Sequence, residues 1–382
     1  MDTCAVLLLC LAGLLALTPA ASGSDTFELA EPQHPAVIVI PAEPSPGEEM
    51  AASEISSYMG LMAAVVVEVR RGFEPAQGSI VISRSPSPEV GDDGYSISIT
   101  DGRLYLTGAR DRSVLYAAYD LLERLGCRWL APGFDCYALA SPFASPAGGE
   151  GEIVPRARPV ILQLDGPVVE KPKLRFRKIY VEEGHSHKRE NLLQMIDWMA
   201  KSRFNTLVVP TDYQGRGRVK WDNWREALTP ELKKRDITIE VGGHGYQNFL
   251  SADMDPSGYA SGGSSPRRIA AGSIELRGEK PPEAYDQHPE WFGMGADGKR
   301  RPEHGRVFCT SNAAAVDYLT KNVVAYLQSR PEIDIFDFWP PDGSKWCECE
   351  ACAKLGTPAD RQSRLVAQVI AEARKQGVKA MT

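Results

Sequence analysis

Polar and aromatic side chains follow four segments of the chain that are predicted to be β-strands, residues 176–181, 205–209, 237–241 and 333–338. In a parallel α/β barrel the functional site lies at the carboxyl ends of the strands, so these positions come first as candidates. Tryptophan and tyrosine beside carboxylates and histidine are typical of a sugar site, where aromatic faces stack on pyranose rings and carboxylates transfer protons. The side chains are Glu182, Glu183 and His185 after the first strand, Thr211, Asp212 and Tyr213 after the second, His244 and Tyr246 after the third, and Trp339 and Asp342 after the fourth.

Four cysteines form a second candidate site. Cys347, Cys349 and Cys352 are closely spaced in a Cys-x-Cys-x-x-Cys pattern after the fourth strand, and Cys309 precedes the helix before that strand. Four thiolates can bind a structural zinc ion tetrahedrally. Two disulfides are an equally weighted alternative, favoured if the protein is exported. In both interpretations the cluster stabilises the loop that carries Asp342. A zinc-dependent hydrolase is disfavoured, because four cysteine ligands leave no coordination position for water.

The elements that position these residues alternate between strand and helix, which is typical of a parallel α/β architecture. Helices are predicted at 189–204, 224–235, 313–329 and 361–376, and a fifth strand at Val378–Met381. A (β/α)8 barrel of the TIM type usually needs about 250 residues, which is more than residues 171–382 supply. We therefore expect a barrel that is truncated after strand 5. An open doubly wound sheet is the alternative, but no glycine fingerprint follows the first strand.

A small α+β domain is predicted before the barrel, at residues 26–150. It begins with a β-branched strand at 37–40 and a helix that runs to Met62, and it contains a hairpin turn at Asp101-Gly102. An amphipathic helix at 113–125 ends at Gly126. A linker is expected at 151–170, after a stretch rich in Ser, Pro, Gly and Ala, and the partial barrel at 171–382.

Composition and the first residues bear on location and partners. Residues 5–17 are almost wholly apolar and are followed by small residues, so residues 1–23 are predicted to be a signal peptide of a secreted or periplasmic protein, with a permanent anchor as the alternative. No other segment approaches the length of a membrane span, so no membrane association is expected after cleavage. A formal net charge of -7 argues against nucleic acid as a partner.

Several short sequence motifs, in a fixed order along the chain, resemble those of a known family. They are Gly242-Gly243-His244-Gly245-Tyr246, His288-Pro289-Glu290-Trp291-Phe292, Asp297-Gly298-Lys299-Arg300, residues 307–312, and residues 339–352 with their Cys-x-Cys-x-x-Cys pattern. The series resembles mostly bacterial glycoside-hydrolase-like proteins of unknown function. Residues 113–133 resemble the end of the small N-terminal domain of α-glucuronidases and β-hexosaminidases.

The resemblance implies roles for individual residues. Asp342 matches the proton donor at the end of the fourth strand, although Pro341-Asp342-Gly343 is also an ordinary turn. The second carboxylate is not identified; Asp212, Glu240 and Asp337 are candidates, and buried ion pairs are the alternative for the last two. Contacts with substrate are expected from Arg177, which could instead form an ion pair in the barrel floor, and from Asp212, His244, Tyr246 and Trp339.

The sequence therefore predicts a secreted glycoside-hydrolase-like protein that acts on the O-glycosyl bonds of poly- or oligosaccharides through carboxylates. No cofactor is required for this chemistry, and zinc would be structural. The alternative from another class is a non-catalytic carbohydrate-binding or scaffold protein on the same fold. Because half of the barrel is expected to be missing, little or no hydrolase activity is expected from residues 1–382 alone.

Overall fold

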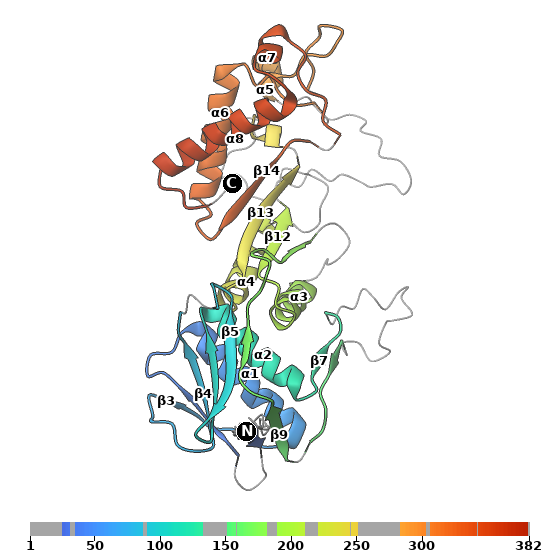
Figure 1. The fold of residues 1–382 in the computed structure, drawn as a ribbon. Helices are drawn as coiled ribbons and strands as arrows, with labels where there is room; N and C mark the ends of the chain where they lie inside the picture. The colour runs from blue at the N-terminus through green and yellow to red at the C-terminus, as the bar shows by residue number, and fades with distance from the viewer. Residues whose placement is uncertain are drawn as a thin grey trace, which may run out of the picture.

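A computed structural model gives the fold of two successive parts of the chain (Figure 1). It describes residues 25–30, 35–86, 90–132, 151–157, 159–181, 189–210, 221–244, 246–250, 283–302, 306–341 and 343–380. The predicted signal peptide lies outside these residues. No helix in the described ranges is long and apolar enough to cross a bilayer.

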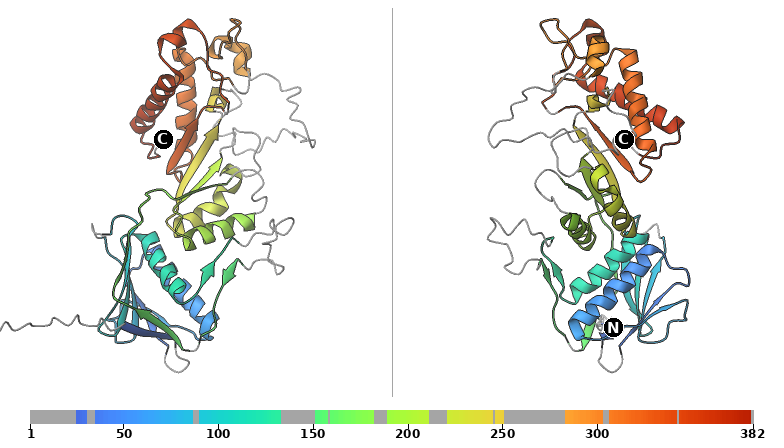
Figure 2. Two further views of the ribbon diagram at one scale, coloured as in Figure 1. Left: turned by 45° about the vertical axis from the view of Figure 1, so that its right-hand side comes forward. Right: turned by 180° about the vertical axis from the view of Figure 1, so that it is seen from behind.

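The first part is a mixed six-stranded sheet with two helices on one face (Figure 2). In spatial order its strands are β10 (Val168–Glu170), β5 (Tyr95–Thr100), β6 (Arg103–Gly108), β4 (Ser79–Arg84), β2 (Val37–Ile40) and β3 (Val69–Arg71). The helices are α1 (Pro46–Ala63) and α2 (Asp111–Arg124). A separate pair joins β1 (Asp25–Ala30) to β9 (Val160–Leu164), and another joins β7 (Arg128–Trp129) to β8 (Glu152–Ile153).

Local signals explain these elements. Ser45 caps α1 and Glu48 returns a hydrogen bond to the backbone of Ser45, which forms a capping box. Asp101 and Gly102 both have positive φ, as a tight hairpin between β5 and β6 requires. Alternate strand residues such as Ile97, Leu104 and Leu106 are fully buried against the helices. The predicted strand, helices and hairpin of this domain are therefore confirmed.

Residues 151–170 are not a linker in the structure. β8, β9 and β10 all lie in this range, and β9 and β10 pair antiparallel with β1 and β5 of the first domain. Val160, Leu162 and Leu164 are buried, which the alternation of apolar residues along β9 could have indicated. The first domain therefore continues to about residue 170.

The second part is a parallel sheet in which strand order follows chain order, β11 (Lys178–Tyr180), β12 (Thr206–Pro210), β13 (Thr238–His244) and β14 (Ile335–Trp339). Each strand is followed by a helix, namely α3 (Arg189–Lys201), α4 (Trp221–Lys234), α6 (Ala313–Gln328) and α8 (Pro358–Lys375). Shorter elements are a 3-10 helix at Tyr246–Leu250, α5 (Glu283–Gln287), another 3-10 helix at Pro289–Trp291 and α7 (Glu350–Lys354). This succession of βα units is the one predicted from the sequence.

The predicted fifth strand is wrong for the residues that can be checked. Residues 378–380 follow α8 without strand structure, and no strand of the described residues pairs with the outer edge of β14. The strand was predicted from a short run of apolar and basic residues after a helix. A strand forms only where a neighbouring strand accepts its hydrogen bonds. Met381 lies outside the described residues.

The two parts are held together by buried charges around Asp93. The carboxylate of Asp93, in the first domain, accepts hydrogen bonds from Arg112 Nε at 2.7 Å, Arg177 Nη2 at 2.7 Å and Asn205 Nδ2 at 2.9 Å. Arg110 also forms a bidentate pair with Asp236, at 2.6 and 2.8 Å. These contacts fix the amino-terminal ends of β11 and β12 against the first domain.

Candidate functional site on the concave face of the parallel sheet

The polar side chains of the parallel sheet lie on one face, together with aromatic and aliphatic ones, and the residues of the opposite face are apolar. Parallel partners in the register lie on the same face, and alternate residues of a strand point to opposite faces. Phe336 and Phe338 of β14 point to the helices, where Phe336 lies 5.8 Å from the ring of Tyr326 in α6. The opposite face, which we call the concave face, carries Lys178, Tyr180, Thr206, Val208, Pro210, Thr238, Glu240, Ile335, Asp337 and Trp339.

The curvature of the sheet is shown by two rings on this face. Tyr180 on β11 and Trp339 on β14 have ring centroids 6.2 Å apart, at an interplanar angle of 38°. Neighbouring strands lie about 4.8 Å apart, so two strands separated by two others would be about 14 Å apart in a flat sheet. The side chains can meet only if the sheet curves toward this face, as the wall of a barrel does.

An acidic pair and a lysine lie one layer below the aromatic pair. Lys178 Nζ is 2.5 Å from Glu240 Oε2, and the side chain of Glu240 is 3% exposed. Burial, a hydrogen bond with Glu240 and the negative charge of Glu240 raise the pKa of Asp337 to about 7, while Lys178 opposes the shift. The buried Asp337 Oδ2 has no hydrogen-bond partner within donor–acceptor distance among the described residues. A proton on this oxygen could be donated to Glu240, whose Oε2 already pairs with Lys178.

Gly242 makes room for Asp337. These two residues are partners in the register of β13 and β14. A Cβ placed on Gly242 would lie 2.3 Å from both the Cβ and the carbonyl oxygen of Asp337. The sequence predicts that the third strand ends at residue 241, before Gly242 and Gly243, but both glycines lie in β13. Gly242 serves the close approach of a neighbouring strand.

Only some of the predicted site residues lie in the described part of the chain. Asp342 and Asp212 lie outside the described residues, as do Glu182, Glu183, His185, Thr211 and Tyr213. The backbone of His244 ends β13 opposite Trp339, so this residue belongs to a strand and not to a loop. Trp339 ends β14 and is 37% exposed, so its ring remains accessible at the rim of the concave face.

Arg177 does not contact this face, and its predicted role in holding substrate is wrong. It precedes β11, at the amino-terminal end of the sheet, whereas the candidate site lies toward the carboxyl ends. Its guanidinium donates to Asp93 Oδ2, to the hydroxyl of Tyr116 at 3.2 Å and to the carbonyls of Arg203 and Leu174. The alternative interpretation, an ion pair in the barrel floor, agrees with these contacts.

Tyr246 is also not available to a substrate. It is fully buried, its ring stacks on Phe338 with centroids 4.5 Å apart, and its hydroxyl donates to Gln362 Oε1 at 2.9 Å. Burial raises the pKa of Tyr246 above its usual value. Its ring therefore packs with Phe338 on the side of the sheet that faces the helices.

Sequence reasoning missed Lys178 and Tyr180. The signal was present, because Lys178-Ile179-Tyr180 alternates polar, apolar and aromatic residues in a predicted strand, which places the first and third on one face. The prediction considered only the residues that follow each strand, so it missed side chains within β11.

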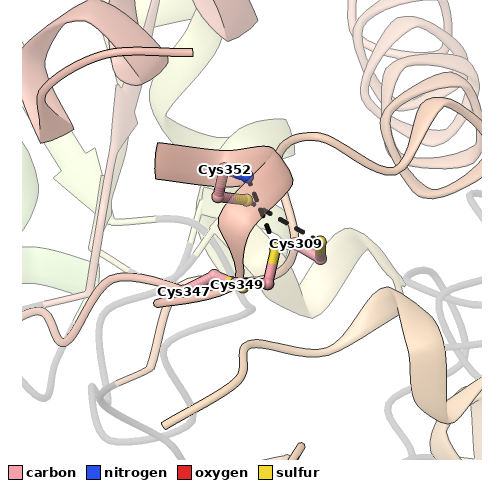
Figure 3. A group of neighbouring side chains, drawn as sticks. All are labelled: Cys309, Cys347, Cys349 and Cys352. Atoms are coloured by element: carbon pink, nitrogen blue, oxygen red, sulfur yellow. Dashed lines mark hydrogen bonds between the residues drawn. The ribbon is translucent and has the colours of Figure 1, made fainter. Parts of the chain in front are cut away.

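The four cysteines of the second candidate site are brought together as predicted (Figure 3). Their sulfur atoms all lie within 4.8 Å of one another, and all four residues are buried. Cys309 precedes α6, Cys347 and Cys349 lie between β14 and α7, and Cys352 lies in α7. No disulfide joins any of the four to another cysteine of the described residues, and the same holds for the buried Cys127 of the first domain.

Two cavities of about 550 and 800 Å³ lie where the first domain meets α3 and α4, away from the concave face. Several of the charged groups that line them are paired with one another. Lys201 Nζ lies 2.7 Å from Asp197 Oδ2 in the first, and Arg84 Nη1 lies 2.9 Å from Asp111 Oδ1 in the second. We therefore assign these cavities to the packing of the two parts.

Comparison with known proteins identifies similar sequences and folds. Residues 147–373 match the model of a family described as a domain of unknown function, DUF4838. No curated protein matches the chain.

Among solved structures, the chain is similar to a GH20 β-N-acetylhexosaminidase from Streptomyces coelicolor, with 12% identity and a TM-score of 0.50 over 93% of this chain and 64% of that one. It is also similar to a β-N-acetylhexosaminidase from Bacteroides fragilis, with 14% identity and a TM-score of 0.47 over 95% and 65%. A mutant β-hexosaminidase from Streptomyces plicatus in complex with GlcNAc has 12% identity and a TM-score of 0.48 over 93% and 63%. The chain thus spans a little less than two thirds of the length of these proteins. The first similarity indicates a glycoside-hydrolase-like α/β fold.

Proposed function

The chain belongs to the DUF4838 family, and we propose that it is a glycoside-hydrolase-like protein whose concave face binds a glycan and supports acid/base cleavage of a glycosidic bond. The observation that carries the proposal is the Asp337–Glu240 pair, which holds a proton near neutral pH beneath an exposed tryptophan. Perturbed carboxyl groups on a concave surface are a mark of functional sites. The β-hexosaminidase fold of the solved structures supports the same class of chemistry.

Each residue has a distinct part in the proposed site. Trp339, together with Tyr180, offers an aromatic surface at the rim on which a sugar ring can stack. Two carboxylates that flank a scissile bond are usually about 5–10 Å apart, which is farther than the direct contact of Asp337 with Glu240. We therefore assign the proton donor to Asp342, by its place after the fourth strand, and its partner carboxylate to the Asp337–Glu240 pair. Lys178 holds Glu240 in place through their ion pair.

The natural setting of this activity is proposed to be outside the cytoplasm. Residues 5–17 form an apolar run followed by small residues, which is the composition of a signal peptide. An extracytoplasmic protein would meet poly- or oligosaccharides there. N-terminal sequencing of the protein from its native host tests this, because export predicts a mature chain that starts near residue 24.

Turnover of fluorogenic glycosides tests the proposed reaction. The natural protein, with any chain that continues past Thr382, is assayed on 4-methylumbelliferyl glycosides that include the β-N-acetylglucosaminide and the α-glucuronide. We expect hydrolysis of at least one, and a loss of about 100-fold or more in kcat/KM for Asp342→Asn. The matched control is Asp286→Asn, at an exposed position in α5. Glycan binding without hydrolysis of any glycoside would instead favour the non-catalytic carbohydrate-binding alternative.

A further inference from the structure

Four cysteine sulfurs in one buried cluster admit either two disulfides or one metal ion, and their geometry distinguishes these outcomes. Cys309 Sγ lies 3.7 Å from Cys349 Sγ and also 3.7 Å from Cys352 Sγ. One sulfur is thus equidistant from two others, whereas two disulfides would divide the four into two bonded pairs about 2.05 Å apart. A tetrahedral zinc ion with Zn–S bonds of about 2.3 Å separates its ligand sulfurs by about 3.8 Å.

We propose that Cys309, Cys347, Cys349 and Cys352 form a structural tetrathiolate site for a zinc ion. All four side chains are buried, with exposures between 0% and 9%. The chemistry of the donors matches the metal, because sulfur ligands in a tetrahedral arrangement select zinc. Figure 3 shows the four side chains converging from the segment before α6 and from α7 with the loop before it.

The surroundings of the sulfurs are suited to thiolates. Backbone amides donate to two of them, from Met294 to Cys347 Sγ at 3.3 Å and from Cys352 to Cys349 Sγ at 3.4 Å. Arg300 Nη1 lies 3.9 Å from Cys347 Sγ and brings a positive charge to the cluster. Four thiolates with one divalent cation have a net charge of −2, so these donors offset negative charge, as the outer partners of metal ligands commonly do.

The site joins segments that are distant in the sequence. Val307 donates a backbone hydrogen bond to Lys345 at 2.8 Å, and Glu348 donates one to Met294 at 2.9 Å. The cysteines also join the segment before α6 to the segment around α7 through their side chains. Since the loop between β14 and α7 directly follows Trp339, the last residue of β14, the metal would fix the rim of the concave face. Four protein ligands leave no position for water, so the ion would not take part in catalysis.

Metal analysis tests the site without reference to any activity. The protein is expressed in medium that contains zinc, purified without chelator, and analysed by inductively coupled plasma mass spectrometry. We expect about one zinc ion per chain for the wild type and for Cys127→Ala, which removes a buried cysteine outside the cluster. We expect the zinc content to fall at least five-fold in Cys309→Ser and in Cys352→Ser.

Two measurements on the wild type keep the test decisive if the serine variants do not fold. Exchange of the metal for cobalt should give the intense visible absorption of a tetrahedral cobalt–thiolate centre. Alkylation of the denatured, unreduced protein followed by mass spectrometry should find all four cysteines labelled. Disulfides among these cysteines, or four free thiols that take up neither zinc nor cobalt, would overturn the proposal.

Discussion

The ring of Tyr180, on the first strand of the parallel sheet, lies 6.2 Å from the ring of Trp339, on the fourth. Two strands separate these residues, so the contact is possible only because the sheet curves around the face they share. Asp337, Glu240 and Lys178 lie on the same face, one layer below. A pair of carboxyl groups, of which Asp337 has a raised pKa, therefore lies beneath the two aromatic rings.

Replacing Asp337 with asparagine should change how stability depends on pH. In the unfolded chain an aspartate has a pKa of about 3.9, whereas in the folded protein the pKa of Asp337 is about 7. Between these values only the folded state keeps the proton, so the contribution of Asp337 to stability is complete below the unfolded pKa and falls as the pH rises toward 7.

Melting temperatures of the wild type and Asp337→Asn between about pH 4.5 and pH 8 measure this effect. The wild type should lose stability relative to the variant as the pH rises, since asparagine does not ionise. Asp286→Asn, at an exposed position, should follow the wild type at every pH. A difference between wild type and Asp337→Asn that is constant over this range would show that the pKa of Asp337 is not raised.

Gly242→Ala should be destabilising for a steric reason. The new methyl group would overlap the Cβ and the carbonyl oxygen of Asp337, so β13 or β14 must shift. Overpacking of this kind costs about 1–3 kcal/mol, and it also displaces Asp337. Chemical denaturation measures the cost. Gly60→Ala in α1 is the control, because its methyl group meets only Val65 O at 3.6 Å and should be neutral or stabilising. Equal stabilities of the two variants would contradict the close strand approach.

Asp93→Ala should destabilise the junction of the two parts. Burial alone would raise the pKa of Asp93, but Arg112, Arg177 and Asn205 together hold it below its usual value. The stabilising contribution of this depressed pKa is therefore present above the unfolded pKa and is lost as the pH falls through the folded pKa. Removing one partner of a buried ion pair costs about 3–5 kcal/mol, since the arginines lose their counter-charge.

Urea denaturation of Asp93→Ala at neutral pH checks this prediction, with Glu68→Ala as the control. Glu68 is paired with Arg70 on the surface, where water screens the pair, so no measurable change is expected. If the two variants unfold at the same urea concentration, Asp93 does not hold the two parts together.

Much of the framework could be predicted because local signals and the final packing agree. The capping box at Ser45 and Glu48, the Asp101-Gly102 turn and the apolar stripe of α2 each specify an element without distant contacts. Residues 151–170 were misassigned because β9 and β10 depend on partners far away in the chain, Phe27 and Tyr95 among them. Such pairings are not visible in a local window of sequence.

The candidate site was predictable in part for the same reason. The sequence places Trp339 and the four cysteines near the carboxyl ends of strands, and the structure locates them there. Arg177 and Tyr246 were misassigned because proximity to a strand end does not determine which way a side chain points. Arg177 donates a hydrogen bond to Asp93 at the opposite end of the sheet, and Tyr246 stacks on Phe338 in the core.

Binding of glycans to the chain tests most directly whether the concave face is a carbohydrate site. Immobilised glycans are probed with the wild type, with Trp339→Ala at the rim, and with Phe73→Ala, which removes an exposed aromatic ring from the first domain. We expect the wild type and Phe73→Ala to bind the same glycans, and Trp339→Ala to bind them at least about 10-fold more weakly, since a stacked ring is lost. Binding that is unchanged in Trp339→Ala, or absent from the wild type for every glycan, would contradict the account.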